Sequence, residues 1–134
     1  MPGRTRTALA AMMGAFAVAL LAGCQSSEGP FASGATAELP AGFSSDEFDS
    51  SSVRLLGADS EGYEYFAAKK KDSSGEDSCV MIVPPGEEGA AVCSGRLPVA
   101  GISHDVRVML SDVPVKENSE SETIGDFLQV ARTD

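Results

Sequence analysis

Apolar residues in the second half of the chain recur in short runs separated by turn-forming residues, a pattern typical of strands. Residues 105–111 alternate strictly, with Val106, Val108 and Leu110 on one face, which predicts a strand with one buried face. Residues 78–83 are almost continuously apolar, which predicts a strand covered on both faces. Further strands are expected over 53–56, 62–68 and 90–94. The pattern predicts a mainly β fold: a small antiparallel meander of five or six strands, curled into a sandwich or half-barrel that protects its edges.

Two cysteines, Cys79 and Cys93, lie on two of these predicted strands. A hairpin centred on Gly86 places them opposite each other, where Cα atoms of an antiparallel pair lie about 4.5–5.5 Å apart, a distance that suits a disulfide. The same register pairs Val80 with Val92 and Ile82 with Ala90. A free thiol pair and a metal site are the alternatives, but the spacing is not CxxC and His104 is the single histidine. We therefore expect one disulfide, which would stabilise the domain by roughly 3 kcal/mol.

The last segment, residues 119–132, fits two structures. Residues 119–122 match a capping box, and apolar residues follow at helical spacing, which favours a helix. Gly125 interrupts that helix, and residues 127–132 also have the composition of a closing strand. We favour the strand and keep the helix as the alternative.

The N-terminus carries a different pattern. Residues 1–7 contain Arg4 and Arg6 and no acidic residue, and the next fifteen residues, 8–22, are uncharged and mostly apolar. A basic start followed by such a run is typical of a secretory signal peptide. Fifteen helical residues span only about 22 Å, less than the roughly 30 Å hydrocarbon core of a bilayer, so a transmembrane helix is disfavoured.

The apolar run ends in Leu21, Ala22, Gly23 and Cys24. These four residues resemble the lipobox of bacterial lipoproteins, in which an aliphatic residue and two small residues precede a cysteine. The resemblance implies that the Cys24 thiol receives a diacylglycerol group and that a peptidase cuts before it. We therefore expect acyl chains such as palmitate on Cys24 to hold the protein on the outer face of the cell membrane. The alternative is an ordinary signal peptide followed by a cysteine by chance.

These features divide the chain into a signal peptide over 1–23, a lipidated cysteine and flexible linker over 24–44, and a β-domain over 45–134. The linker is expected because residues 25–42 are rich in Gly, Ser, Ala and Pro and carry only two charges. A flexible chain of that length would reach about 23 Å and lift the domain clear of the lipid headgroups.

Residues 52–94 are similar to small domains of unknown function in actinobacterial lipoproteins and membrane proteins. The similarity consists of an Arg-bearing first strand at 52–56, an aromatic second strand at 63–68, an aliphatic run after Cys79, and Cys93 after the hairpin. It implies a small two-cysteine β-domain and implies no activity.

The net charge of the chain narrows the classes of molecule that the protein is expected to bind. The chain has 20 acidic and 10 basic residues, and loss of the leader would remove Arg4 and Arg6, leaving 8 basic residues and a formal charge of −12. A strongly acidic surface disfavours nucleic acid and direct contact with anionic lipid. We therefore expect no nucleic-acid partner, membrane attachment through Cys24, and an envelope protein or a cationic ligand as the partner.

The sequence lacks the familiar catalytic motifs. It contains no HExxH, GxSxG, SxxK, GxGxxG or P-loop pattern. Ser103, His104 and Asp105 are chain neighbours, which cannot readily converge as a triad, and the acidic loop 72–77 has its glycine at the wrong place for an EF-hand. We therefore expect no catalytic residue, metal or cofactor, and predict a non-catalytic binding or interaction module. The alternatives are a structural envelope protein without a specific ligand and a small hydrolase.

Overall fold

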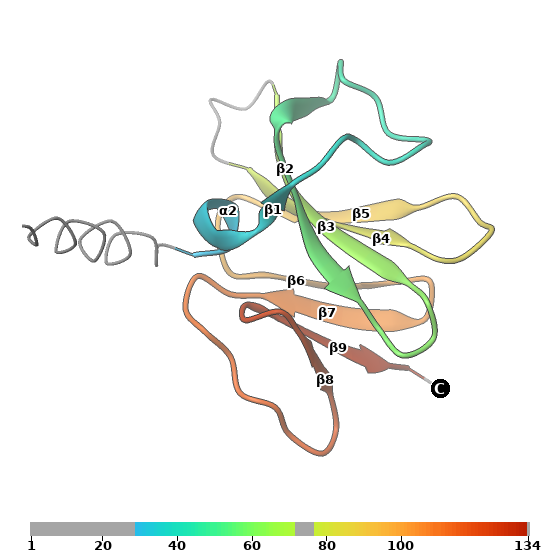
Figure 1. Cartoon of the computed structure of the whole chain (residues 1–134), viewed down its shortest axis with the longest axis vertical. Helices are drawn as coiled ribbons and strands as arrows, with labels where there is room; N and C mark the ends of the chain where they lie inside the picture. The colour runs from blue at the N-terminus through green and yellow to red at the C-terminus, as the bar shows by residue number, and fades with distance from the viewer. Residues whose placement is uncertain (1–28, 72–76, 134) are drawn as a thin grey trace, which may run out of the picture.

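The computed structural model describes residues 29–71 and 77–133, which form two antiparallel sheets packed face to face (Figure 1). The predicted leader over 1–23, Cys24 and most of the acidic loop 72–77 lie outside these residues. Within the described part of the chain, no helix has the length and apolar character needed to cross a bilayer. The predicted mainly β fold is confirmed, in the form of a sandwich rather than a closed barrel.

Sheet A contains the first five strands in chain order, and sheet B has the order β6-β7-β9-β8. The elements are α2 (Pro30–Ser33), β1 (Ala35–Thr36), β2 (Phe48–Ala58), β3 (Glu64–Lys70), β4 (Ser78–Val83), β5 (Ala90–Ser94), β6 (Val99–Ser103), β7 (Val106–Leu110), β8 (Glu122–Ile124) and β9 (Leu128–Arg132). Sheet A is the predicted meander, whereas sheet B departs from it because β9 pairs with β7 and leaves β8 at the edge.

The prediction of five or six strands was too low, since the described residues form nine. The strands that the pattern missed are β1, β6 and β8. They are two, five and three residues long, and β6 contains a glycine in its centre. Such strands offer too few side chains for an alternating pattern to stand out.

The predicted hairpin is present in the predicted register. Cys79 pairs with Cys93, Val80 with Val92 and Ile82 with Ala90. The Cys79–Cys93 disulfide is formed, with Cα atoms 4.0 Å apart. Cys79 is fully buried and Cys93 is exposed, so the bridge joins the core of sheet A to its surface.

The main core lies between the two sheets. Its side chains come from alternate positions of β3, β4, β7 and β9 and from residues beside them: Tyr65, Ala67, Val80, Ile82, Val99, Val106, Val108, Leu110, Ile124, Phe127, Leu128 and Val130. The alternation predicted for 105–111 is therefore confirmed, because Val106, Val108 and Leu110 point inward and Arg107 and Met109 are exposed.

A second, smaller core covers the opposite face of sheet A. Its buried members are Phe48, Val53, Phe66, Ala68, Cys79 and Met81. Strand β4 contributes alternate residues to the two cores, so every residue from Ser78 to Ile82 is buried. This confirms the prediction that residues 78–83 are covered on both faces.

The cover on the outer face of sheet A is residues 37–47, which we call the strap. Ala37, Leu39 and Phe43 pack against the second core, and the Phe43 ring meets the Phe48 ring edge-on at 5.7 Å between centroids. The Ala37 N–H donates to the Val53 carbonyl at 3.2 Å. Residues 30–43, which the sequence assigned to a flexible linker, are thus part of the folded domain. The physical reason is that the outer face of sheet A is too apolar to face water.

Upstream of the strap, α2 caps one end of the sandwich. Pro30 is fully buried, and Phe31 packs against the main core. Two cationic side chains hold this turn: Arg54 Nε donates to the Phe31 carbonyl at 2.9 Å, and Lys69 Nζ lies 4.9 Å from the centre of the Phe31 ring. The chain therefore enters the folded domain at α2.

The strand favoured for the final segment is confirmed as β9. The alternative helix does not form because residues 125–127 make a turn between β8 and β9, with Gly125 at a φ of 65°. Its apolar residues Ile124, Phe127 and Leu128 instead point into the main core from two strands and their turn.

Glycines allow close approach at the two open sides of the sandwich. A Cβ on Gly101 of β6 would lie 2.5 Å from Val92 Cγ1 of β5, and a Cβ on Gly57 of β2 would lie 2.8 Å from Ile124 Cγ2 of β8. Side chains at these positions would push the sheets apart, which explains why glycine stands at each.

Replacing Phe43 by alanine tests whether the strap belongs to the fold. Because the ring is partly buried, we expect Phe43→Ala to lower the free energy of unfolding by about 1–2 kcal/mol, below the roughly 3–5 kcal/mol typical of a fully buried phenylalanine. Urea unfolding of the two proteins measures the difference. Glu38→Ala, an exposed substitution in the same strap, should stay within about 0.5 kcal/mol. Equal stability of Phe43→Ala and wild type would contradict the packing of the strap.

Candidate functional site

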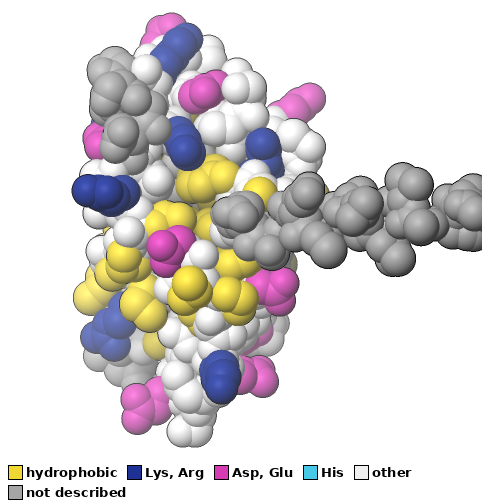
Figure 2. Space-filling view, turned by 90° about the vertical axis from the view of Figure 1, so that its left-hand side faces the viewer, with side chains coloured by type: hydrophobic (Ala, Val, Ile, Leu, Met, Phe, Trp, Pro, Cys, Tyr) yellow, Lys and Arg dark blue, Asp and Glu magenta, His cyan; other side chains and the backbone are white. Residues whose placement is uncertain are grey.

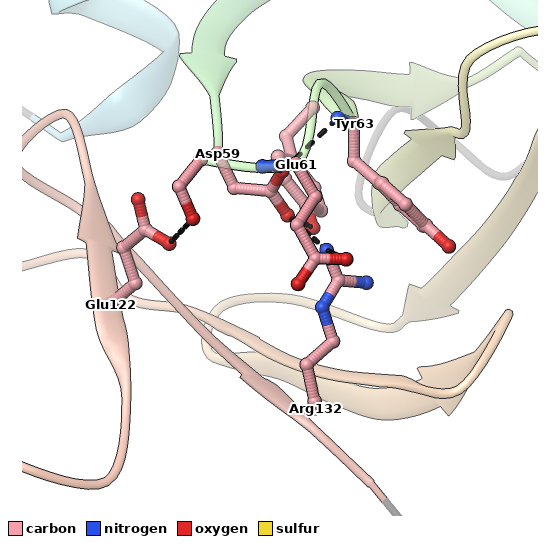
Figure 3. A network of polar contacts seen from close by, with 7 residues as sticks. Asp59, Glu61, Tyr63, Glu122 and Arg132 are labelled. Carbon is pink, nitrogen blue, oxygen red and sulfur yellow. Dashed lines mark hydrogen bonds and ion pairs between the residues drawn. The ribbon is translucent and has the colours of Figure 1, made fainter.

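The most organised polar group of the domain surrounds Asp59, in the turn between β2 and β3 (Figure 3). The turn closes because the Asp59 N–H donates to the Tyr63 carbonyl at 2.9 Å and the Gly62 N–H donates to the Asp59 carbonyl at 3.1 Å. This geometry directs the Asp59 side chain inward, where it is only 2% exposed.

Four donors satisfy the Asp59 carboxylate. Its Oδ1 accepts the N–H groups of Glu61 and Tyr63 at 2.9 and 3.0 Å. Its Oδ2 accepts the Tyr65 hydroxyl at 2.8 Å and Arg132 Nη2 at 2.7 Å. A buried carboxylate needs this degree of compensation, since an unpaired charge in the interior is very costly.

Arg132 brings the second sheet into the network. Arg132 is the last residue of β9. Its guanidinium carbon lies 4.0 Å from the centre of the Tyr63 ring, and its Nη2 lies 3.4 Å from Glu61 Oε1. A weaker contact of 3.4 Å joins the Ser60 hydroxyl to Glu122 of β8 (Figure 3). The network therefore ties the β2–β3 turn of sheet A to two strands of sheet B.

Burial raises the pKa of Tyr65 far above its ordinary value, and its hydrogen bond to Asp59 raises it further. The hydroxyl thus keeps its proton and acts as a permanent donor to Asp59. Because the carboxylate already accepts four bonds and is closed off from solvent, it has no free lone pair for a substrate. The geometry suits a structural link between sheets, not acid–base chemistry.

Ser103, His104 and Asp105 form the tip of the β6–β7 hairpin. His104 and Asp105 both have positive φ values, 52° and 61°, as a tight two-residue turn requires. The Asp105 carbonyl accepts the Thr133 N–H at 2.9 Å, which anchors the C-terminal residues to this turn. Among the described residues, no hydrogen bond or ion pair joins the side chains of these three residues to one another.

Two of the surface hollows bear on function. One, of about 240 Å³, lies on the outer face of sheet B and includes Ala100, Arg107, Met109 and Gln129 in its lining. It is smaller than the roughly 300–1,000 Å³ usual for small-molecule pockets.

The larger hollow, of about 470 Å³, is open to solvent and lies between the β4–β5 hairpin and the strap. Three exposed carboxylates, Glu64, Glu87 and Glu88, line it. None of the described residues that line it is basic, so the hollow favours a cationic group. Within residues 29–71 and 77–133, no three His, Cys, Asp or Glu side chains are grouped as a metal ion would require.

Sequence reasoning placed the Cys79–Cys93 bridge correctly and missed the Asp59 network. Asp59 and Arg132 are separated by 73 residues, so no local spacing joins them. The available signal was an aspartate three residues after the strand predicted over 53–56, with a glycine three residues later, which indicates a turn but gives no partner.

No family model matches the chain, and no similar protein was found among curated sequences or solved structures. The function must therefore be argued from the residues of this chain.

Replacing Asp59 by asparagine tests the role of the network. The change preserves the side-chain shape but removes the charge that faces Arg132 and turns one acceptor into a donor. We expect a loss of about 2 kcal/mol in the free energy of unfolding, less than for a fully buried pair because Arg132 is 30% exposed.

The matched control is Glu61→Gln, which removes an exposed carboxylate facing the same guanidinium and should change stability by at most about 0.5 kcal/mol. Chemical denaturation at neutral pH measures all three proteins. Equal effects of the two substitutions would show that the buried carboxylate does not link the sheets.

Proposed function

We propose that this protein is an extracytoplasmic lipoprotein, held on the outer face of the cell membrane by acyl chains on Cys24, whose β-domain is a non-catalytic interaction module. The observation that carries the proposal is the sequence at the N-terminus. A basic start, an apolar run too short to span a bilayer, and Leu21-Ala22-Gly23-Cys24 follow one another in the order that lipoprotein precursors have. Two acyl chains on one cysteine provide stable anchoring.

The Cys79–Cys93 disulfide supports an oxidising location. Disulfides persist outside the cytosol and are rare within it, where thiol reductants keep cysteines reduced. The bridge has one exposed partner, Cys93, and would be open to such reductants.

The surface supports interaction in preference to catalysis. The one buried carboxylate network among the described residues is saturated by its own donors. The acidic hollow is open to solvent, and its lining contains no Ser, Thr, Cys, His or Lys. A hollow lined by Glu64, Glu87 and Glu88 suits a cationic ligand or a basic segment of an envelope protein. The −12 charge of the mature chain acts in the same direction.

Replacing Cys24 by serine tests the anchoring. The wild-type protein should fractionate with membranes and be released by detergent, whereas Cys24→Ser should appear in the soluble extracytoplasmic fraction because it lacks the thiol that carries the lipid. Intact-mass measurement of the wild type should give a chain that begins at Cys24 and carries the mass of its acyl groups.

Ala91→Ser, a conservative change on β5 far from the leader in sequence, serves as a processing control and should remain with the membranes. Membrane association of Cys24→Ser at the wild-type level, or a wild-type mass without lipid, would refute the proposal.

A further inference from the structure

We propose that the α2 end of the domain lies directly against the lipid headgroups, with Arg54 and Lys69 contacting lipid phosphates, and that the acidic hollow consequently points away from the membrane. This inference rests on the proposed anchoring at Cys24. It adds an orientation and a second membrane contact to that anchor.

The first argument is the length of chain between the anchor and the fold. The strap and α2 are packed parts of the domain, so only residues 25–28 separate Cys24 from Gly29. Five residue steps span at most about 18 Å even when fully extended. A linker of the expected eighteen residues could have held the domain at a distance, but this one requires that α2 stay beside the headgroup layer.

The second argument is the chemistry of that end. Arg54 and Lys69 both touch Phe31, one through its carbonyl and one over its ring, so both cations are fixed beside the point where the chain enters the domain. Arg54 Nη1 is held further by the carbonyls of Ser51 and Val53 at 2.9 and 3.0 Å. Within the described residues neither cation lies within ion-pair distance of a carboxylate, and Asp49, which pairs with Lys69 across β2 and β3, offsets only part of the Lys69 charge.

The surroundings of α2 also suit a lipid surface. Figure 2 looks onto this end of the domain and shows hydrophobic side chains gathered there, with Lys and Arg side chains around them and some acidic ones between. Leu55, which pairs with β1 next to α2, is 37% exposed. The acidic residues Asp112 and Asp126 lie beside Gly29 and Pro30 and offset part of the positive charge.

The opposite end of the domain carries a different charge. Strand β3 begins with Glu64, which pairs with Val83, and ends near Lys69, which pairs with Ser78. The β4–β5 hairpin with Glu87 and Glu88 therefore projects from the Glu64 end, away from α2 (Figure 1). An anionic membrane repels that end and attracts the Arg54 and Lys69 end, so both charges favour the same orientation.

The test uses the full lipidated protein, isotope-labelled, in nanodiscs of phosphatidylcholine and phosphatidylglycerol that contain a gadolinium-chelating headgroup lipid. Paramagnetic broadening of backbone amide signals reports distance from the headgroups. We expect residues 31–36 to lose most of their signal and residues 86–88 to keep theirs. Uniform broadening, or stronger broadening at the hairpin, would overturn the proposed orientation.

Two variants separate the contributions of linker length and charge. A Gly/Ser insertion of about fifteen residues between 28 and 29 restores the long linker and should greatly reduce the contrast between the two ends; an unchanged contrast overturns the length argument.

Lys69→Gln should weaken the preference for this orientation roughly fivefold. Arg107→Gln, which removes an exposed cation from the outer face of sheet B, should leave it unchanged. Equal effects of the two substitutions overturn the phosphate contact.

Intact mass distinguishes this inference from the function on which it rests. If Cys24 is lipidated and the paramagnetic broadening is the same at both ends of the domain, the proposed orientation alone is wrong. If Cys24 carries no lipid, the anchoring and the orientation fall together.

Discussion

Strand β4 is apolar on both faces, and the rest of the structure shields both faces from solvent. Val80 and Ile82 point into the core between the sheets, while Cys79 and Met81 point to the other side of sheet A. A single sheet can bury only one of these faces by pairing with a second sheet. Sheet B covers the inner face, and the outer face needs a separate cover, which the strap supplies.

This requirement links the architecture to the proposed location. The residues that the sequence assigned to a flexible linker pack against sheet A as the strap. The folded domain therefore begins only five residues after Cys24. Meanwhile the disulfide fixes β4 to β5, and the Asp59–Arg132 pair fixes the β2–β3 turn to β9. The result is a cross-linked domain with α2 at one end and an acidic hollow at the other. We infer that the α2 end faces the membrane and that the acidic hollow faces away from it.

The sequence pattern within short windows predicted the β4–β5 hairpin and strand β7. The spacing of Cys79 and Cys93 around a glycine turn fixed the hairpin and its register, and strict alternation identified β7. The strap was missed because Ala37, Leu39 and Phe43 follow no helical or strand period and stand among Gly and Pro, a composition that also describes linkers. The Asp59–Arg132 pair was missed because its partners meet only after both sheets have formed. Neither feature has a signal within a short window of sequence.

The role of the strap as the outer cover of sheet A is tested most directly by hydrogen exchange at the Ala37 amide. This N–H lies one residue beyond β1 and donates to the Val53 carbonyl of β2, which extends the β1–β2 pairing into the strap. If the strap is part of the cooperative fold, Ala37 should exchange as slowly as Val80 in the centre of β4, because both amides would open only when the domain unfolds. Exchange of Ala37 at the rate of an unstructured peptide, with Val80 still protected, would contradict the account.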